Sequence, residues 1–495
     1  MARKLMLMAA LLPSLAALYG CAEGDLATIT IDAPTENVTN NTDGGGDAGD
    51  AGDTGGQPGD VSTNCPAFSG AKPINADGND VCALPAVISE SQTLTPDVIW
   101  LMEGTVTVGN GNNEIDENGE LTNGNPLLNV VLTIEPGTQI QGATGTFANM
   151  IITRGSRIEA VGTEADPIIF SSDDAGLDGS GEWGGLIMHG FGEHNQCDTV
   201  QMICNIDSEG ESGFAGGFVA DDNSGTLSYV IVAEGGFEFS PGNEINGISL
   251  VGVGSGTTMD HIQVQGNSDD GIEFYGGAVN LKYGVFTDNL DDSVDWDEGF
   301  VGNLQFIIVR QSENSFGNAF EMDTQGNPLP LSKPTLANVT VIGHGVEGDE
   351  TEMLVFKAGS GGFFHNTVLT VDDANGTIDN CLLIEGADSE ALINTALVVN
   401  NWVADCQGGA GVGVIGNDTL DATTISAVEA QLDMNLASQA PEALLAEPLD
   451  WVAINGIFSE SLADVDFLEA TDFIGAVNPD GSDVWWATWT LDGTL

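Results

Sequence analysis

The chain has 495 residues, of which 9 are Lys or Arg and 75 are Asp or Glu, so its formal net charge is −66. So few cations disfavour binding to nucleic acid or to anionic membrane surfaces, because both of these attract Lys and Arg. Hydrophobic residues make up 41% of the chain, enough to bury a core, and 67 glycines favour an all-β, turn-rich body.

Residues 1–20 have the features of a secretory signal peptide. Arg3 and Lys4 form a basic start, and residues 5–18 supply an apolar run that is short for a membrane span. The run ends at Leu18-Tyr19-Gly20-Cys21, which is similar to the lipobox of bacterial lipoproteins. We therefore predict lipidation of Cys21 and attachment to the outer membrane, at the cell surface or on its periplasmic face. An ordinary signal peptide followed by an unmodified Cys is the alternative.

Residues 21–60 read as a tether that follows the predicted lipid anchor. The stretch 44–60 consists mainly of Gly and Asp and has almost no apolar side chains. Such a sequence cannot offset the entropy lost on ordering, and its charges repel one another, so a flexible linker is expected. The next region, 61–125, is assigned to an N-terminal cap that contains a disulfide.

Six cysteines follow Cys21, an even number that indicates disulfides in an exported protein. Pairing of nearest neighbours is the simplest of the 15 possible connectivities. It predicts the disulfides Cys65–Cys82, Cys197–Cys204 and Cys381–Cys406. A zinc site is the alternative for the second pair, with the ligands His189, His194, Cys197 and Cys204.

The body of the chain, residues 126–410, carries an internal repeat. Its first segment has apolar residues at Ile248, Ile272, Val294 and Phe320, and Met353–Lys357 is a weaker fifth copy. A second segment begins at Leu227, Met259, Leu281, Leu304 and Leu336. Apolar and polar residues alternate within each segment, which indicates strands. The first segment recurs about every 24 residues, a period that predicts a right-handed parallel β-helix with one coil per repeat.

Acidic residues recur at the outward positions of the repeated strand, and stacked coils would bring them about 5 Å apart. Like charges at this separation repel, so such a column needs a counterion, shared protons or strong solvation. Calcium accepts six to eight oxygen ligands in flexible geometry, so it is the counterion that suits such a column most directly. The predicted metal ligands are Asp270, Glu273, Asp292, Asp295, Asp297, Glu321 and Asp323, with Asp269 and Asp291 beside them. A solvated acidic face that binds no ion is the alternative.

Other motifs add little chemistry. Glu114–Gly119 resembles the first half of a calcium loop but lacks its twelfth-position Glu, and an Asn/Asp/Gly turn explains it equally well. The sequence contains no phosphate loop, dinucleotide fingerprint or haem motif, so no organic cofactor is expected.

The C-terminal region, 411–495, changes in character. Ile425, Val428, Leu432 and Leu436 have the spacing of an amphipathic helix, and 441–446 suggests another. The chain ends with three tryptophans at Trp485, Trp486 and Trp489. Because the open end of a solenoid exposes strand edges, we predict a short helical and Trp-rich cap there. An aromatic platform for sugars is the alternative.

The run from Asn243 to Phe300, with 181–190 before it and 473–490 after it, resembles a widespread group of exported Gram-negative lipoproteins. The resemblance covers about residues 90–490. It implies a right-handed β-helix and no established activity.

Together these features favour a lipid-anchored binding or structural module stabilised by calcium, with a role in adhesion or in binding a polysaccharide or protein partner. The alternative is a glycoside hydrolase or polysaccharide lyase that uses the acidic face, since β-helices often process polysaccharides. Asp292 and Gly343-His344-Gly345 distantly resemble pectin-cleaving motifs, but more than two repeats separate them. Nearby cations are single residues, namely Lys282, Arg310 and Lys357.

Overall fold

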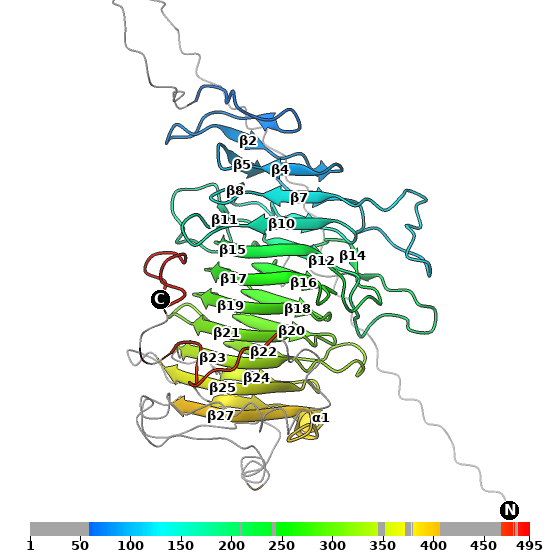
Figure 1. Cartoon of the computed structure of the whole chain (residues 1–495), viewed down its shortest axis with the longest axis vertical. Coiled ribbons are helices and arrows are strands. Elements are labelled where there is room, and N and C mark those ends of the chain that lie inside the picture. Colours follow the sequence, from blue (N-terminus) through cyan, green and yellow to red (C-terminus); the bar gives the residue numbers. More distant parts are fainter. Residues whose placement is uncertain are drawn as a thin grey trace, which may run out of the picture. The chain divides into compact units, whose positions relative to one another are not determined.

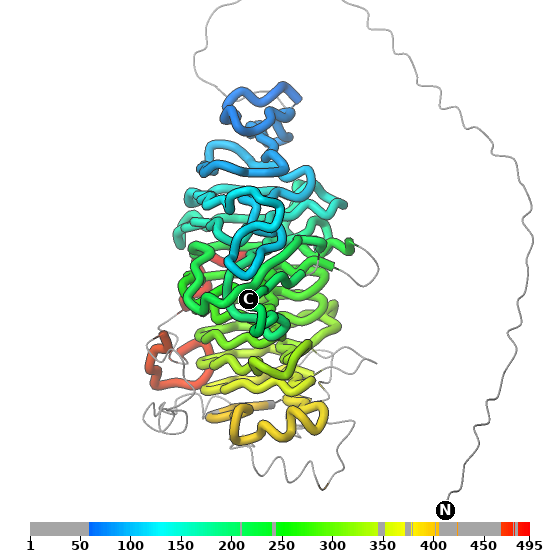
Figure 2. Tube along the Cα trace, turned by 90° about the vertical axis from the view of Figure 1, so that its right-hand side faces the viewer, coloured from blue at the N-terminus to red at the C-terminus, as the bar shows by residue number. Residues whose placement is uncertain are grey.

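The computed structural model describes residues 59–207, 210–239, 244–344, 352–371, 378, 380–405, 423, 467–478, 480 and 484–495. Parallel strands from successive repeats stack on one another as the coils of a right-handed β-helix (Figures 1 and 2), which confirms the predicted fold class. The signal peptide, Cys21 and nearly all of the tether lie outside the described residues. Among the described residues, no helix has the length and apolarity to cross a membrane.

Two parallel sheets form the walls of the coils in the described part of the chain. The longer sheet has 15 strands: β1 (Gly70–Ala71), β2 (Val81–Ala83), β4 (Gln92–Leu94), β5 (Ile99–Met102), β7 (Val131–Ile134), β8 (Gln139–Gly142), β10 (Arg157–Val161), β11 (Ile168–Ser172), β15 (Gly225–Ala233), β17 (Thr258–Gln265), β19 (Asn280–Thr287), β21 (Asn303–Arg310), β23 (Thr335–Gly343), β25 (Gly362–Val371) and β27 (Leu397–Asp405). Only β1 pairs antiparallel within it.

The shorter sheet has ten strands: β3 (Val87–Ile88), β6 (Val106–Val108), β9 (Met150–Ile152), β12 (Leu186–His189), β16 (Ile248–Val251), β18 (Ile272–Tyr275), β20 (Val294–Asp297), β22 (Phe320–Met322), β24 (Glu352–Phe356) and β26 (Asn380–Ile384). A small hairpin joins β13 (Ile206–Asp207) to β14 (Phe214–Ala215), and α1 (Gly386–Glu390) follows β26. From β12 onward each coil contributes one strand to the shorter sheet and one to the longer, whereas the earlier coils contribute two short strands to the longer sheet, namely β4 and β5, β7 and β8, and β10 and β11.

The core consists of columns of apolar side chains that point into the coils. Ile248, Ile272, Val294 and Phe320 face one another in consecutive strands, as the repeat predicts, and all four are fully buried. The second interior column contains Leu250, Phe274, Trp296 and Met322, which are fully buried as well. Burial of such a side chain stabilises the fold by about 1.5–3 kcal/mol.

From β15 to β25, each strand of the longer sheet is bent at a residue with left-handed backbone. These residues form the bend column: Tyr229, His261, Tyr283, Phe306, Asn338 and Asn366, with φ between 51° and 60°. This conformation is unfavourable for side chains with a Cβ. The aromatic members offset part of the cost by stacking, since ring centroids of Tyr229 and His261 lie 4.1 Å apart and those of His261 and Tyr283 lie 4.5 Å apart.

Parallel coils begin earlier than expected. β2 pairs with β5, and β3 with β6, both in parallel register, inside the region 61–125 that the sequence analysis assigned to a cap. The first coils escaped detection because their strands are very short and carry none of the repeated segments. The boundary at residue 126 is therefore corrected to about residue 81.

The Trp-rich segment is also placed differently from the prediction. Trp485, Trp486 and Trp489 pack against Tyr229 and Ile231 on the flank of the longer sheet, rather than over the open end beyond β27. Their partners include rings of the bend column, a feature that the sequence pattern did not reveal. The predicted helices at 425–446 lie outside the described residues.

Two of the predicted disulfides are present, Cys65–Cys82 and Cys197–Cys204. Cys381 is disulfide-bonded as well, and its expected partner Cys406 lies outside the described residues. The Cys197–Cys204 bond leaves no free thiolates there, so the zinc alternative was wrong. Of the two histidines proposed as further ligands, His189 is buried and contacts the Ser212 hydroxyl at 3.1 Å, and His194 lies 2.6 Å from Glu298.

Arg154 holds the N-terminal coils to the loops beside them. Its side chain is fully buried, and it donates to the carbonyl oxygens of Gly111, Asn113 and Cys204 at 2.7–2.8 Å. Burial lowers the pKa of Arg154 to about 10, so the group is still charged at neutral pH. Backbone carbonyl oxygens thus stabilise the charge of Arg154 in place of a counterion.

We expect Arg154→Met to lower the free energy of unfolding by at least about 3 kcal/mol, because several buried carbonyls would lose their donor. The exposed Arg157 is the control, and Arg157→Met should change the free energy of unfolding by less than about 0.5 kcal/mol. Urea denaturation measures both. Equal effects of the two substitutions would contradict this role of Arg154.

Candidate functional site

The acidic residues stack in the predicted register on the outer side of the shorter sheet. Glu273 pairs with Asp295, and Asp295 pairs with Glu321, in three consecutive coils. We use the name acidic ladder for the seven carboxylates of this surface: Asp270, Glu273, Asp292, Asp295, Asp297, Glu321 and Asp323. Their stacking is confirmed, whereas their binding of a metal stays a prediction.

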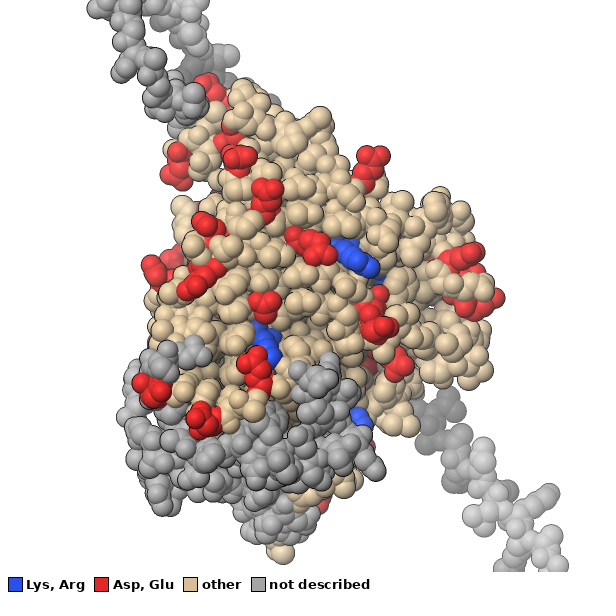
Figure 3. Space-filling view, in the orientation of Figure 1, with Lys and Arg blue, Asp and Glu red and all other residues tan. Residues whose placement is uncertain are grey.

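Most of the acidic ladder is buried, although it points away from the core. The exposed fractions of Asp270, Asp292 and Asp297 are 7%, 5% and 4%. This burial argues against the alternative of a freely solvated acidic face. Acidic side chains elsewhere are spread over the surface among few Lys or Arg (Figure 3), and there water can solvate them.

A loop from an earlier coil lies beside the carboxyl ends of these strands. Residues 190–196, after β12, run along the carboxyl ends of three strands: Gly192 donates to the Gly252 carbonyl, Gly277 donates to the Glu193 carbonyl, and Asn195 donates to the Glu298 carbonyl, at 2.6–2.9 Å. We call residues 190–196 the wall loop. It borders the acidic ladder at the carboxyl ends of the strands, where Asp297 ends β20.

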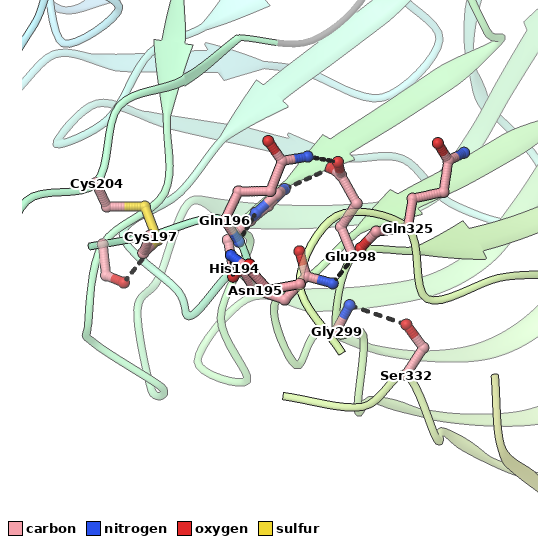
Figure 4. Close-up of polar contacts among 11 residues, drawn as sticks. His194, Asn195, Gln196, Cys197, Cys204, Glu298, Gly299, Gln325 and Ser332 are labelled. Carbon is pink, nitrogen blue, oxygen red and sulfur yellow. Dashed lines mark hydrogen bonds and ion pairs between the residues drawn. A yellow bond between two sulfur atoms is a disulfide. The ribbon is translucent and has the colours of Figure 1, made fainter. Parts of the chain in front are cut away.

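Side chains fasten the wall loop to the coil after β20 (Figure 4). His194 Nε2 lies 2.6 Å from a carboxylate oxygen of Glu298, and the Gln196 amide donates to the same carboxylate. The Asn195 amide donates to the Gln325 carbonyl, and the disulfide Cys197–Cys204 follows directly. Asp297, a member of the acidic ladder, directly precedes Glu298 in the chain, so these contacts lie beside it.

Burial and mutual repulsion raise the pKa values of the central carboxyls well above their usual range. For Asp270, burial is the largest cause, followed by the charges of Asp292 and Asp295. For Asp292, burial is followed by Glu321 and Asp295. For Asp295, burial is followed by Glu321. In the absence of a cation, protons are therefore expected to neutralise part of this group.

Polar partners satisfy the two ends of the acidic ladder. At one end, the Asn246 amide donates to Glu273 Oε2 and to the Tyr275 hydroxyl. At the other end, Lys357 Nζ forms an ion pair with Glu321. The pKa of Lys357 is raised, since the hydrogen bond and charge of Glu321 outweigh the lowering caused by burial.

The middle of the acidic ladder is compensated only in part, since Lys357 lowers the pKa of Asp295 but does not outweigh burial and the charge of Glu321. Carboxylate oxygens of Asp270, Glu273 and Asp295 lie within 4.8 Å of one another, and so do oxygens of Asp292, Asp295 and Glu321. Asp295 belongs to both groups, and its buried Oδ1 has no hydrogen-bond partner among the described residues. A buried carboxylate oxygen without a partner is costly, so the position of Asp295 favours a bound cation.

The Glu114–Gly119 segment has the hydrogen bonds of a turn. In the Glu114–Gly119 turn, Asp116 Oδ1 accepts the N–H groups of Asn118 and Glu120 at 2.8 and 3.0 Å, which is the bonding of an Asx turn. These bonds lower the pKa of Asp116. Lys282 lies on β19 of the longer sheet and pairs with Glu469. Lys282 is therefore not available to the acidic ladder.

Comparisons with known proteins agree with this architecture. Residues 119–441 match the model of the family described as a pectate-lyase-like β-helix domain, which is more than half of the chain. The chain belongs to the pectate-lyase-like β-helix family. No curated protein matches it.

Among solved structures, the Streptococcus pneumoniae surface protein and adhesin PfbA aligns with 68% of this chain and 87% of its own. The two are 10% identical, with a TM-score of 0.18. A likeness at this level carries no argument about function. Membership of the pectate-lyase-like β-helix family defines the fold, and the acidic ladder must be interpreted from its own chemistry.

The raised pKa values predict an unusual pH dependence of stability. A carboxyl whose pKa is higher in the folded state stabilises the fold below its unfolded pKa, about 4, and loses this contribution as pH rises through the folded pKa. In chelator, the melting temperature should therefore fall from mild acid to neutral pH. Asp292→Asn should reduce this fall, because the amide cannot ionise.

The matched control is Asp97→Asn, which removes one negative charge at an exposed position. It should leave the pH profile of the melting temperature as in the unchanged protein. Differential scanning calorimetry between pH 5 and 8 measures all three proteins. A profile that Asp292→Asn alters no more than Asp97→Asn would contradict the assigned cause.

Proposed function

We propose that this protein is an exported, lipid-anchored β-helix of the outer membrane, whose acidic ladder binds Ca²⁺ and which binds a polysaccharide. The lipobox-like sequence before Cys21 supports the anchor, and the shortage of Lys and Arg argues against nucleic acid as a partner. Membership of the pectate-lyase-like β-helix family supports a carbohydrate-related role only coarsely. The protein acts as a binding or structural module at the cell surface or the periplasmic face.

One observation carries the calcium proposal, namely the buried Asp295 Oδ1 that has no hydrogen-bond partner among the described residues. Asp295 contributes to a group in which its oxygen and those of Asp270 and Glu273 lie within 4.8 Å of one another. Three carboxylates around one point favour a hard cation with oxygen ligands. Ca²⁺ tolerates the irregular geometry that stacked strands impose, whereas Mg²⁺ requires a near-ideal octahedron.

The position of Lys357 limits the number of ions. Its ammonium group already neutralises Glu321, so the group of Asp292, Asp295 and Glu321 has an internal cation. In the other group, the charges that act on Asp270 are those of neighbouring carboxylates. We therefore expect one Ca²⁺, bound nearer to Asn246 than to Lys357.

The ion supplies a way to bind a glycan. Three carboxylates fill only part of a shell of six to eight oxygens, so hydroxyl or carboxylate oxygens of a polysaccharide can complete it. The wall loop on one side would orient the sugar chain along the acidic ladder.

Calcium binding is tested by isothermal titration calorimetry together with the melting temperature. The protein should bind one Ca²⁺ and melt at a higher temperature in its presence. Asp295→Asn should weaken binding at least tenfold, about 1.4 kcal/mol, because it removes a charged ligand. Asp97→Asn serves as the control and should bind as the unchanged protein does.

Lys357→Met tests the assignment of the internal cation. Without its ammonium group, the second group of carboxylates should accept an ion, and the stoichiometry should rise from one towards two. Absence of binding heat and of a melting shift at millimolar Ca²⁺ would overturn the calcium proposal.

A second function, cleavage of a polysaccharide by hydrolysis or elimination, is favoured by the raised pKa values of Asp270 and Asp292. A buried carboxyl that keeps its proton near neutral pH can act as a general acid beside an ionised neighbour. If so, incubation with a panel of polysaccharides should release reducing ends, and Asp292→Asn should lower the rate at least a hundredfold. Release that survives this substitution would remove the acidic ladder as the catalytic site.

A further inference from the structure

The described C-terminal residues, 467–478, 480 and 484–495, cross the flank of the β-helix beside the bend column. They are the red segments that lie against the middle coils in Figures 1 and 2. Residues 469–476 contact β21, β23 and β25, and residues 485–494 contact β15, β17 and β19. We call the described part of 467–495 the strap, and the surface beneath it the flank groove.

Side-chain amides of the flank groove bind the backbone of the strap. Gln305 accepts the Glu469 N–H and donates to the Glu469 carbonyl, both at 2.7 Å. Asn338 donates to the carbonyls of Phe473 and Gly475 at 3.1 and 3.0 Å. These contacts bind main-chain groups of the strap, so they do not depend on the identity of its side chains.

Two further contacts fix the position of the strap along the groove. Gln263 accepts the Leu491 N–H at 2.8 Å, which extends the amide pattern to the far end. Trp489 is 3% exposed and packs edge-on against the rings of Tyr229 and His261. A buried Trp between aromatic partners is the type of anchor that dominates interface energies.

In a chain whose net charge is −66, the two acidic groups whose charges act on Tyr229 of the flank groove have partners: Asp260 lies 2.7 Å from His261 Nδ1, and the Thr488 hydroxyl of the strap donates to Glu164. Two copies of so acidic a protein repel each other, and contact between their acidic surfaces is unfavourable. Amides and aromatic rings form the flank groove, and its cation, Lys282, pairs with Glu469 of the strap. The groove is therefore a surface on which a second copy can be bound without opposing like charges.

The covalent connection does not limit the strap to its own β-helix. Residues 406–466 join it to β27, and a connection of this length can span far more than the width of a β-helix. The contacts described above depend on backbone groups and on one ring, and a strap from another copy offers the same groups. Exchange of an identical element between copies is a low-cost route to assembly.

We propose that the flank groove binds the strap of a second copy as well as its own, so that neighbouring chains are joined by exchange of residues 467–495. The partner is thus another copy of this chain. The inference stands on the flank groove alone and does not depend on calcium or on a glycan.

A disulfide trap tests the exchange. A Cβ at Gly475 would lie 3.7 Å from Val368 Cβ, a separation that suits a disulfide. Full chains carry Cys21→Ser, so that no lipid is attached and no thiol competes. One chain carries Val368→Cys, and the other, enlarged by a fused tag, carries Gly475→Cys. Exchange of the strap brings these two thiols of different chains together, so mixed dimer in excess of the control below reports exchange.

The control chain carries Gly493→Cys in place of Gly475→Cys. Gly493 has a similar positive φ, 84° against 91°, but nothing lies within 4 Å of its added Cβ. After mixing at high concentration at 37 °C, we expect at least ten times more mixed dimer for Gly475→Cys than for the control. The yield should rise with concentration, as read on a non-reducing gel.

A third chain carries both Val368→Cys and Gly475→Cys and reports the contact within one copy. If its internal disulfide closes but the mixed pair gives no more dimer than the control, exchange is overturned. If the internal disulfide fails to close, the strap does not occupy the flank groove, and the proposal is overturned at its base. Mixed dimer well above the control supports it.

Discussion

The stacking of coils at the spacing of neighbouring strands, about 4.8 Å, is the constraint on which the rest of this structure depends. It places each outward side chain against its counterpart in the next coil. For Asp295 the counterparts are Glu273 and Glu321. Two carboxylates about 5 Å apart repel by about 3 kcal/mol at an effective dielectric of about 20, and burial increases the cost. The outer side of the shorter sheet is therefore a place where charge must be neutralised.

Glu273 and Glu321, at the two ends of the stack, have a hydrogen-bond donor and a cation as partners respectively. Asn246 and Lys357 satisfy Glu273 and Glu321, while Asp295 between them keeps an oxygen without a described partner. Glu273 and Asp295 are almost fully buried, which makes the missing charge more important. The outer side of the longer sheet differs from that of the shorter sheet, since it carries amides and stacked rings, which bind the strap, in place of stacked carboxylates. The two flanks thus differ in chemistry although the same coils build them.

The sequence predicted the register well because the repeat fixes it. Ile272 and Val294 occupy equivalent positions in consecutive copies of the repeat, and they lie side by side in neighbouring strands. The ion pair between Glu321 and Lys357 could also have been predicted, since the weaker fifth copy of the repeat ends at Lys357 and continues the same columns. The burial of the acidic ladder could not be predicted. The wall loop, which runs along the carboxyl ends of the strands beside Asp297, has no repeat and lies several coils earlier in the chain.

The bend column escaped prediction for a different physical reason. Gly and Asn are the residues that normally signal left-handed backbone, but four of the six bends occur at Tyr, His or Phe. Their stacking offsets the local strain, and this is visible only when the coils are superposed. The same rings hold the Trp-rich strap, which explains why the expected cap at the open end lies on the flank.

The most direct test of the central claim is anomalous diffraction from crystals soaked in Ca²⁺, with Tb³⁺ as a second probe at the same position. A cation held by the acidic ladder should give a peak about 2.3–2.6 Å from Asp295 Oδ1, with Asp270 and Glu273 as further ligands. No peak at millimolar Ca²⁺, with carboxyl oxygens of neighbouring coils instead within hydrogen-bonding distance of one another, would show that protons alone neutralise the stacked acids and would contradict the account.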